Sequence, residues 1–209
     1  MRQSRNFQKE LDKKIQHLLD EGEHPSLLLH ACCAPCSSYV LEYLTQYFDI
    51  TVFYYNPNIT EPEEYNKRVC EIKRLIKEMP QTKGTAFIEG SYEPEKFFEM
   101  SKGLEDVPEG GERCRKCFQL RLLETAKLAA EGGYDYFTTS LTISPLKNAA
   151  VLNEVGKQAA AAYPGSAFLN SDFKKKNGYK RSIELSREYN LYRQNYCGCI
   201  YSKQKANSR

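Results

Sequence analysis

Residues 27–36 decide the fold and read Leu-Leu-Leu-His-Ala-Cys-Cys-Ala-Pro-Cys. The apolar start of this stretch predicts a short buried strand over residues 26–31, and apolar residues at helical spacing follow it. The cysteines Cys32, Cys33 and Cys36 therefore fall on a strand-to-helix turn. At such a turn thiols face the free N–H groups and the positive end of the next helix, which lowers the thiol pKa. The turn thus favours thiolates that bind metals or attack sulfur.

Four further β-branched or aromatic segments predict strands, and helical patterns separate them. The expected strands cover residues 49–55, 85–88, 134–140 and 167–169, and the expected helices include 4–21, 113–130 and 182–190. Strands that alternate with helices imply a parallel sheet with right-handed crossovers. We therefore expect an α/β fold, a five-stranded parallel sheet with helices on both faces. It should be Rossmann-like, in the manner of HUP and PP-loop proteins, with helical additions.

In such a sheet, ligands gather beyond the carboxyl ends of the strands. The unusual residues of this chain follow the ends of the expected strands. The cysteines follow the first strand, Asn56-Pro57-Asn58 the second, residues 140–148 the fourth and a lysine-rich segment the fifth. The sequence therefore predicts one site at this edge of the sheet.

The length of 209 residues and the hydrophobic share of 41% suit one substantial core. We expect an N-terminal helical extension over residues 1–25, a single α/β catalytic domain over 26–202 and a basic tail over 203–209. The formal net charge of +3 neither demands nor excludes a polyanionic partner. No apolar signal segment and no run long enough to span a membrane is present. We therefore expect a cytoplasmic protein, in which clustered cysteines indicate metal or redox chemistry more often than disulfides.

Six of the eight cysteines form three close groups. They are the turn already described, Cys114 with Cys117, and Cys197 with Cys199. Cys114 and Cys117 share one face of their expected helix, so both sulfurs can reach one centre. A closed metal site needs about four converging ligands, and the first group can supply the other two. Ligand type alone does not separate an iron-sulfur cluster from zinc or from thiol redox chemistry.

Two cysteine pairs also carry redox interpretations. Cys33 and Cys36, separated by Ala-Pro, match a thioredoxin-like dithiol-disulfide oxidoreductase, although that class leaves the Cys-x-x-Cys of the later helix unexplained. A bridge between Cys197 and Cys199 would be strained and easily reduced, so the two are either a labile redox pair or free thiols in a tail. Cys70 lies beside the apolar face of its expected helix, which favours a buried small hydrophobe.

Residues 172–181 carry a basic cluster interleaved with the rings of Phe173 and Tyr179. Such clusters contact phosphates, and rings can stack a splayed base, as in the recognition of single-stranded RNA loops. A charge run is also commonly a solvated face, and a zinc-bearing RNA-binding module stays open as an alternative function. The first strand-to-helix turn has no glycine for a backbone phosphate cradle, so no nucleotide cofactor is expected. The basic residues of the cluster are Lys174, Lys175, Lys176, Lys180 and Arg181.

Seven segments form an ordered set of motifs. They are His-Ala-Cys-Cys-Ala-Pro-Cys at 30–36, Tyr-Asn-Pro-Asn-Ile at 55–59, Glu-Tyr-Asn-Lys-Arg at 64–68, Arg-Cys-Arg-Lys-Cys at 113–117, Thr-Ser-Leu-Thr-Ile-Ser-Pro at 139–145, and the segments 172–182 and 192–202. Together they resemble the QueH-type epoxyqueuosine reductases of bacterial tRNA modification. The resemblance covers residues 27–202, and several motifs in order are far more specific than one Cys-x-x-Cys.

The resemblance implies an iron-sulfur-dependent reductase that deoxygenates epoxyqueuosine at the tRNA wobble position to queuosine, the last step of queuosine biosynthesis. It also implies a 4Fe-4S cluster without cobalamin, with tRNA as the partner and an electron donor that the sequence does not identify. An additional iron beside the cluster is associated with the family, and Cys36 is a candidate ligand for it. The implied redox-active pair is Cys197 and Cys199. The implied cluster ligands are Cys32, Cys33, Cys114 and Cys117.

Overall fold

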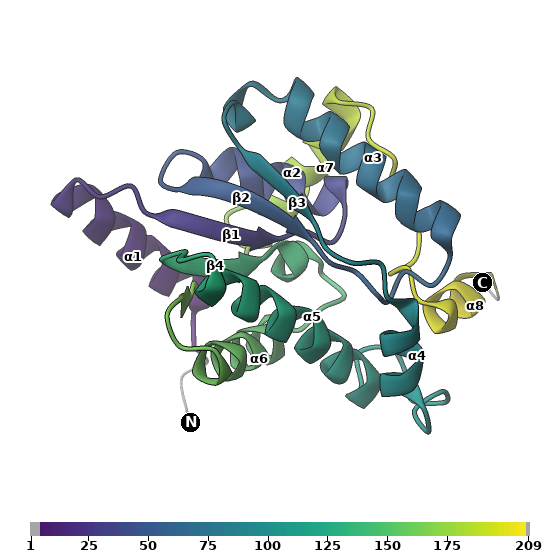
Figure 1. Cartoon of the computed structure of the whole chain (residues 1–209). Coiled ribbons are helices and arrows are strands. Elements are labelled where there is room, and N and C mark those ends of the chain that lie inside the picture. Colours follow the sequence, from purple (N-terminus) through teal and green to yellow (C-terminus); the bar gives the residue numbers. More distant parts are fainter. Residues whose placement is uncertain (1–4, 208–209) are drawn as a thin grey trace.

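The computed structural model describes residues 5–207, so residues 1–4 of the expected extension and 208–209 of the expected tail lie outside the described residues. Its centre is a five-stranded sheet in the order β3-β2-β1-β4-β5, with every neighbouring pair parallel (Figure 1). The prediction of a five-stranded parallel sheet is therefore confirmed. The strands are β1 (Ser26–His30), β2 (Asp49–Tyr54), β3 (Ala86–Glu89), β4 (Tyr136–Thr139) and β5 (Ala167–Phe168).

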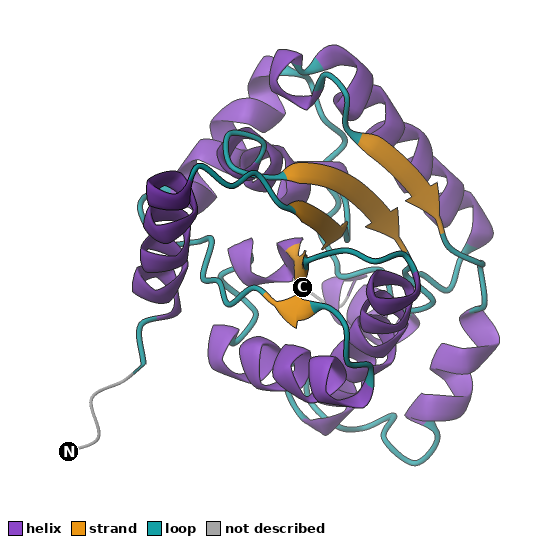
Figure 2. Cartoon of the chain, turned by 60° about the vertical axis from the view of Figure 1, so that its left-hand side comes forward, coloured by secondary structure: helices purple, strands orange, loops and turns teal. Residues whose placement is uncertain are grey.

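Helices cover both faces of this sheet (Figure 2). On one face lie α1 (Phe7–Glu21), α2 (Ala34–Leu44), α3 (Pro62–Glu78) and α7 (Gly178–Glu188). On the other face lie α5 (Glu112–Glu131) and α6 (Ala149–Ala162), with α4 (Pro94–Ser101) packed on α5. Two short 3-10 helices, η1 (Pro80–Thr82) and η2 (Ser140–Ile143), follow α3 and β4.

The central strand β1 is buried on both faces because its side chains alternate between two cores. Leu27 and Leu29 belong to the core beneath α1, α2 and α3, whereas Leu28 belongs to the core beneath α5 and α6. All three leucines are 0% exposed. A continuous apolar run is the signature of such a doubly covered parallel strand, which is why the sequence identified β1 so clearly.

The sheet has its topological switch point between β1 and β4. The chain leaves β1 toward β2 on one side, and β4 continues toward β5 on the other. The loops after these two strands meet, since the backbone N–H of Cys32 donates a hydrogen bond of 3.2 Å to Oγ of Ser140. Ligands of this class of sheet bind in the crevice outside the carboxyl ends at such a point.

The C-terminal part differs from the sequence prediction in two respects. Helix α7 begins at Gly178 rather than at residue 182, and a Cβ at Gly178 would lie 2.0 Å from the carbonyl oxygen of Phe173 and 2.4 Å from the ring of Tyr39. Only glycine lets the first turn of α7 pack this closely. A further helix, α8 (Ile200–Asn207), was not predicted and runs across the expected boundary at residue 202. Among residues 5–207, no helix is both long and apolar enough to cross a membrane.

Candidate active site

The first group of cysteines lies where the sequence placed it, between the end of β1 and the start of α2. Cys33 caps α2, because its sulfur accepts a hydrogen bond of 3.4 Å from the backbone N–H of Cys36. The sulfurs of Cys32, Cys33 and Cys36 all lie within 4.8 Å of one another. These three thiols could therefore hold one metal ion.

Electrostatics prepare one of these thiols for deprotonation. Hydrogen bonds from the thiols of Cys32 and Cys36 hold the pKa of Cys33 well below its usual value; burial opposes this shift and the charge of Arg68 supports it. Hydrogen bonds with Cys32 and Cys33 raise the pKa of Cys36 well above its usual value, and burial adds to this shift. Of the three thiols of the turn, Cys33 is therefore the one whose pKa is lowered, whereas the pKa values of Cys32 and Cys36 are raised.

His30 supports this turn from below. It is 0% exposed, its Nδ1 lies 2.9 Å from the hydroxyl of Thr139, and its Nε2 lies 3.1 Å from the carbonyl oxygen of Tyr55. Burial lowers the pKa of His30 to about 3, and the charge of Arg121 adds to the shift. The imidazole is therefore neutral, donating from Nε2 to Tyr55 and accepting at Nδ1 from Thr139. It ties the ends of β1, β2 and β4 together and acts as a positioning residue.

The other two groups of cysteines come together around a cavity of about 110 Å³, which we call the second cavity to distinguish it from the larger one beside the turn. Cys114 and Cys117 lie on the first turns of α5, as predicted, and Cys197 and Cys199 reach them from the segment before α8. Burial raises the pKa of Cys117 to about 12 and that of Cys199 to about 11. These thiols stay protonated at neutral pH unless a bound metal replaces the proton.

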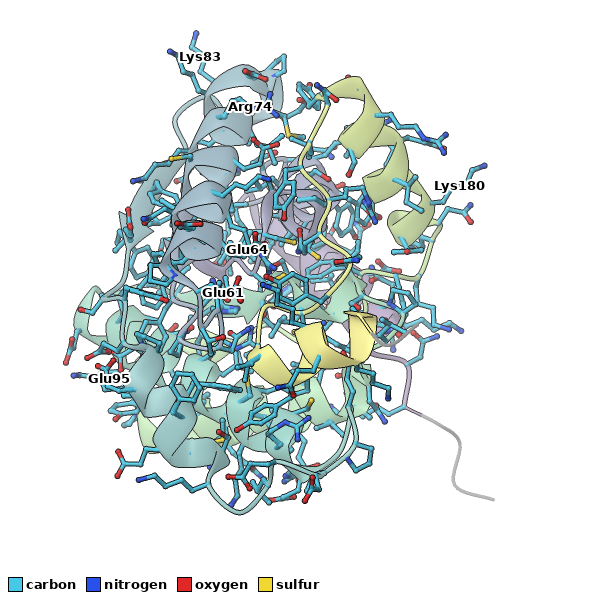
Figure 3. The ribbon with its side chains drawn as sticks, turned by 90° about the vertical axis from the view of Figure 1, so that its right-hand side faces the viewer. Glu61, Glu64, Arg74, Lys83, Glu95 and Lys180 are labelled. Atoms are coloured by element: carbon cyan, nitrogen blue, oxygen red, sulfur yellow. The ribbon has the colours of Figure 1, made fainter. Side chains whose placement is uncertain are left out.

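The segment that carries Cys197 is fixed to helix α3. The carbonyl oxygen of Cys197 accepts hydrogen bonds from Arg68 at 3.3 Å and from Asn58 at 3.4 Å. Beyond it, α8 lies across the carboxyl edge of the sheet (Figure 3), and Lys203 forms an ion pair of 2.6 Å with Glu61. These contacts hold the segment that carries Cys197 close to the cysteine turn, from which it is distant in sequence.

A larger cavity of about 370 Å³ adjoins the second one and is lined by Cys32, Cys33, Cys36 and Cys197. The two cavities share a wall, and Cys197 lines both of them. All three groups of cysteines thus line one continuous region at the switch point, although the compact set of three sulfurs does not include Cys114 or Cys117. The shared lining consists of Glu109, Arg121, Leu146, Lys147, Cys197 and Ser202.

Buried cations surround these cysteines, and sequence reasoning missed them. Arg121 is 1% exposed and donates to the carbonyl oxygen of Cys117 at 3.2 Å and to Oδ1 of Asn56 at 3.3 Å. Its Nη2, like that of the equally buried Arg68, has no hydrogen-bond partner among residues 5–207. Arginines on predicted helices give no local signal of burial, so only the packing of α3 and α5 could reveal them.

Lys147 adds a third positive charge from the loop after η2. Burial lowers the pKa of Lys147, but the nearby sulfurs of Cys197, Cys32 and Cys36 outweigh burial and hold the pKa above its usual value. The lysine lines both cavities. The region is therefore built for an anionic or electron-rich occupant.

The structure places the basic cluster of residues 172–181 beside the site but pairs much of it. Lys174 lies 2.5 Å from Asp172, Lys176 lies 2.7 Å from Asp12, and Arg181 lies 2.6 Å from Glu42. The other two cations of the cluster, Lys175 and Lys180, are exposed and form no ion pair with a described residue. Three of the five predicted RNA-binding cations already have a carboxylate partner.

Two predictions about side chains were wrong. Phe173 is 1% exposed and belongs to the core, so its ring cannot stack a base. Cys70 is exposed on α3 rather than buried, because it lies just outside the apolar stripe of that helix. In both cases the neighbouring residues in the sequence suggested the wrong exposure of the side chain.

The fold and the site define an α/β protein with a cysteine-rich metal or redox centre at the switch point of its sheet. The sequence family described as "Epoxyqueuosine reductase QueH" matches residues 27–205. The chain belongs to this QueH family.

Relatives that carry the name "Epoxyqueuosine reductase QueH" align over most of the chain. The protein of Staphylococcus epidermidis is 47% identical over 204 residues, covering 96% of this chain and 85% of the relative. That of Streptococcus pyogenes serotype M1 is 45% identical over 199 residues, covering 94% and 78%. A more distant relative from Thermotoga maritima is 34% identical and covers 85% and 90%. The resemblance found in the sequence motifs is therefore confirmed at the level of the family.

Proposed function

We propose that this chain is an epoxyqueuosine reductase, which converts the epoxide of epoxyqueuosine in tRNA to the alkene of queuosine. The observation that carries the proposal is the meeting of three groups of cysteines at the switch point of a sheet whose family bears this name. A thioredoxin-like dithiol would need only Cys33 and Cys36. A zinc-bearing RNA-binding module would leave the protonated thiols around the second cavity without a role.

The proposed cofactor is a 4Fe-4S cluster held by Cys32, Cys33, Cys114 and Cys117. Thiolates around iron and sulfide form an anionic group, and the Nη2 atom of buried Arg121 has no hydrogen-bond partner among residues 5–207, whereas Arg68 is already paired with Glu64 at 2.7 Å. Lys147 supplies further positive charge at the same wall. The donor set and its surroundings therefore fit a cluster. Cys36, the third thiol of the turn, is the proposed ligand for an additional iron.

The reaction takes up two electrons and two protons and releases the epoxide oxygen as water. A bound cluster would supply electrons to a substrate held in the adjoining cavity. The residues of this chain bind the substrate, hold the cluster thiols and deliver protons. Lys147 is positively charged and lines both cavities, so it can orient the leaving oxygen by its N–H groups.

Cys197 and Cys199 are the proposed redox-active pair. Oxidation of two thiols to a disulfide releases two electrons and two protons, which equals the demand of the epoxide. Because burial raises the pKa of Cys199 to about 11, this thiol carries its proton together with its electron at neutral pH. A small thiol or a dithiol protein must then reduce the disulfide again. A bridge across one residue is easily reduced, which suits this return step.

The proposed substrate surface includes the basic cluster of residues 172–181, with tRNA as the partner. Lys175 and Lys180 are its most accessible cations. Lys174, Lys176 and Arg181 would exchange their carboxylate partners for phosphates on binding. A tRNA substrate also implies action in the cytoplasm.

Anaerobic purification followed by iron and sulfide analysis tests the cofactor. The loaded protein is then incubated with tRNA that carries epoxyqueuosine and with a chemical reductant, and nucleosides are measured by mass spectrometry. We expect sulfide in the protein, iron equal to the sulfide for the cluster plus one more iron where the additional site is filled, and loss of one oxygen from the modified nucleoside. Zinc without sulfide, or an active metal-free dithiol, would contradict the proposal.

A further inference from the structure

The outer part of the larger cavity carries a second basic surface, distinct from the cluster of residues 172–181. Five cations line the cavity, against one acid, Glu109. Two of the cations, Arg68 and Arg121, are buried at its base, and Lys147 lies between. The remaining two, Arg193 and Lys205, are exposed at the rim. We call Arg193, Lys205 and the adjoining Leu146 the cavity rim.

The cations of the rim are less neutralised than those of the basic cluster. The guanidinium of Arg193 donates to the hydroxyl of Ser186 at 2.9 Å, which is a neutral partner. Neither Arg193 nor Lys205 forms an ion pair with any residue in the described part of the chain. A phosphate that approaches the rim therefore displaces no carboxylate, whereas one that approaches Lys174 or Lys176 must break an ion pair.

Leu146 gives the rim an apolar contact as well. Its side chain is 77% exposed, the highest value among the large hydrophobic residues of the described chain, and it lines both cavities. An exposed leucine at the mouth of a charged cavity gains nothing from folding. Proteins that unstack bases commonly insert such an apolar side chain against a neighbouring base.

We propose that the substrate RNA docks across the cavity rim, with phosphates on Arg193 and Lys205 and with Leu146 packed against the base beside a splayed nucleotide. The inference rests on the proposed function, because it takes the substrate to be a modified base in a tRNA loop. The splayed base enters the cavity of about 370 Å³ toward Cys32 and Cys197. The rim, rather than the basic cluster, then supplies the main phosphate contacts.

RNA suits this surface better than a protein electron donor. The three rim side chains line the same cavity as the cysteines of the turn and Cys197, so a base bound in that cavity lies beside them. An electron donor needs only proximity to the centre and has no need of an open cavity. Charge, an apolar residue and a deep cavity at one place match a nucleotide that is held outside its stack.

Binding of an unmodified anticodon stem-loop RNA to the cluster-loaded protein tests the inference, with affinity measured by fluorescence anisotropy at several salt concentrations. The double variant Arg193→Ala with Lys205→Ala should bind about tenfold more weakly at low salt, and the slope of log affinity against log salt should fall by about 1.4. Leu146→Ser should weaken binding but leave that slope unchanged, since it removes no phosphate contact.

The matched control removes two charges elsewhere, by Lys83→Ala with Lys127→Ala. Both lysines are exposed; Lys83 directly follows η1, beyond the C-terminal end of α3 (Figure 3), and Lys127 lies in the C-terminal half of α5. The control should bind RNA within about twofold of the wild type. Thermal unfolding of each variant checks that its fold is intact.

Two results would overturn the inference while leaving the proposed function standing. One is wild-type RNA binding by the rim variant together with weak binding by Lys175→Ala with Lys180→Ala. The other is a rim variant that binds RNA normally but turns over more slowly with a protein reductant only, which would make the rim a docking site for the electron donor. A wild-type protein that neither binds this RNA nor reduces epoxyqueuosine would instead refute the proposed function.

Discussion

The turn after β1 and the second cavity both present cysteines, yet they treat sulfur in opposite ways. At the turn, hydrogen bonds from the thiols of Cys32 and Cys36 hold the pKa of Cys33 well below its usual value. Around the second cavity, burial raises the pKa of Cys117 to about 12. The difference teaches that closely packed thiols lower the pKa of one of their number, whereas burial raises the pKa of Cys199 even though the backbone N–H of Ser202 donates to its sulfur. The second cavity needs a metal or an oxidant before its sulfurs act.

The largest expected effect comes from removing the sulfur of Cys33 from the turn. Cys33→Ser should lower iron affinity by more than about 100-fold, because loss of a ligand exceeds the 10- to 100-fold loss typical of residues that only support a ligand. Iron and sulfide content after anaerobic reconstitution measures this change.

Cys70→Ser is the matched control for that variant, since Cys70 is an exposed thiol on α3 outside both cavities. It should bind iron and sulfide as the wild type does. Equal iron content in the Cys33→Ser variant would show that the two regions do not differ in the way described.

A smaller loss is expected from Arg121, which lies between the two regions. Arg121→Met removes the charge and the unpartnered Nη2, so iron affinity should fall about 10- to 100-fold, the equivalent of one charge-assisted hydrogen bond. Arg121→Lys keeps the charge and should recover part of the affinity. Competition with a chelator measures both values. If Arg121→Met and the wild type hold iron equally, the guanidinium serves packing alone.

The opposite pKa shifts predict a pH dependence of stability in the metal-free protein. An unfolded thiol loses its proton near pH 8.5, whereas folded Cys117 keeps it to about pH 12 and folded Cys199 to about pH 11. The unfolded state thus binds fewer protons in this window. The free energy of unfolding should therefore fall as pH rises above about 8.5, by about 1.4 kcal/mol per pH unit for each buried thiol.

Cys33 should change the free energy of unfolding in the opposite direction. Because the pKa of Cys33 is lowered in the folded state, its contribution to stability is present at high pH and is lost as pH falls through the folded-state pKa. Urea unfolding of the wild type, Cys117→Ala and Cys33→Ala across the pH range separates the two contributions. If the free energy of unfolding of the two variants changed with pH in the same way, the two regions would not differ in their thiol pKa values as described.

The smallest effect is expected from the hydrogen bond between Thr139 and His30, which lies next to the turn and away from the second cavity. Thr139→Val leaves Nδ1 of buried His30 without its hydrogen-bond donor and the N–H of Leu141 without its acceptor. We expect a loss of about 1–3 kcal/mol in the free energy of unfolding. The pKa of Cys199, in the second cavity, should not change. A change of equal size at both regions would show that they are coupled through β4.

How much of the site the sequence revealed depended on the distance between its parts along the chain. The turn of Cys32, Cys33 and Cys36 was predicted with its geometry, because a buried strand followed by a proline at a helix start fixes the local backbone. The rim was not predicted, because Arg193 and Leu146 lie in loops whose composition resembles that of any surface loop. Nor was α8, whose residues show almost no apolar periodicity.

The amino-acid sequence alone determined the five strands and the alternation of strands and helices before α8, the parallel sheet, the cysteine turn and the family. These depend on periodicity, turn residues and ordered motifs, all of which are local properties of the chain. Only the tertiary structure decided that Arg68 and Arg121 are buried beside the cysteines, that Phe173 enters the core and that three cations of the basic cluster are already paired. Burial and pairing of charges depend on which distant segments meet, and no local pattern records that.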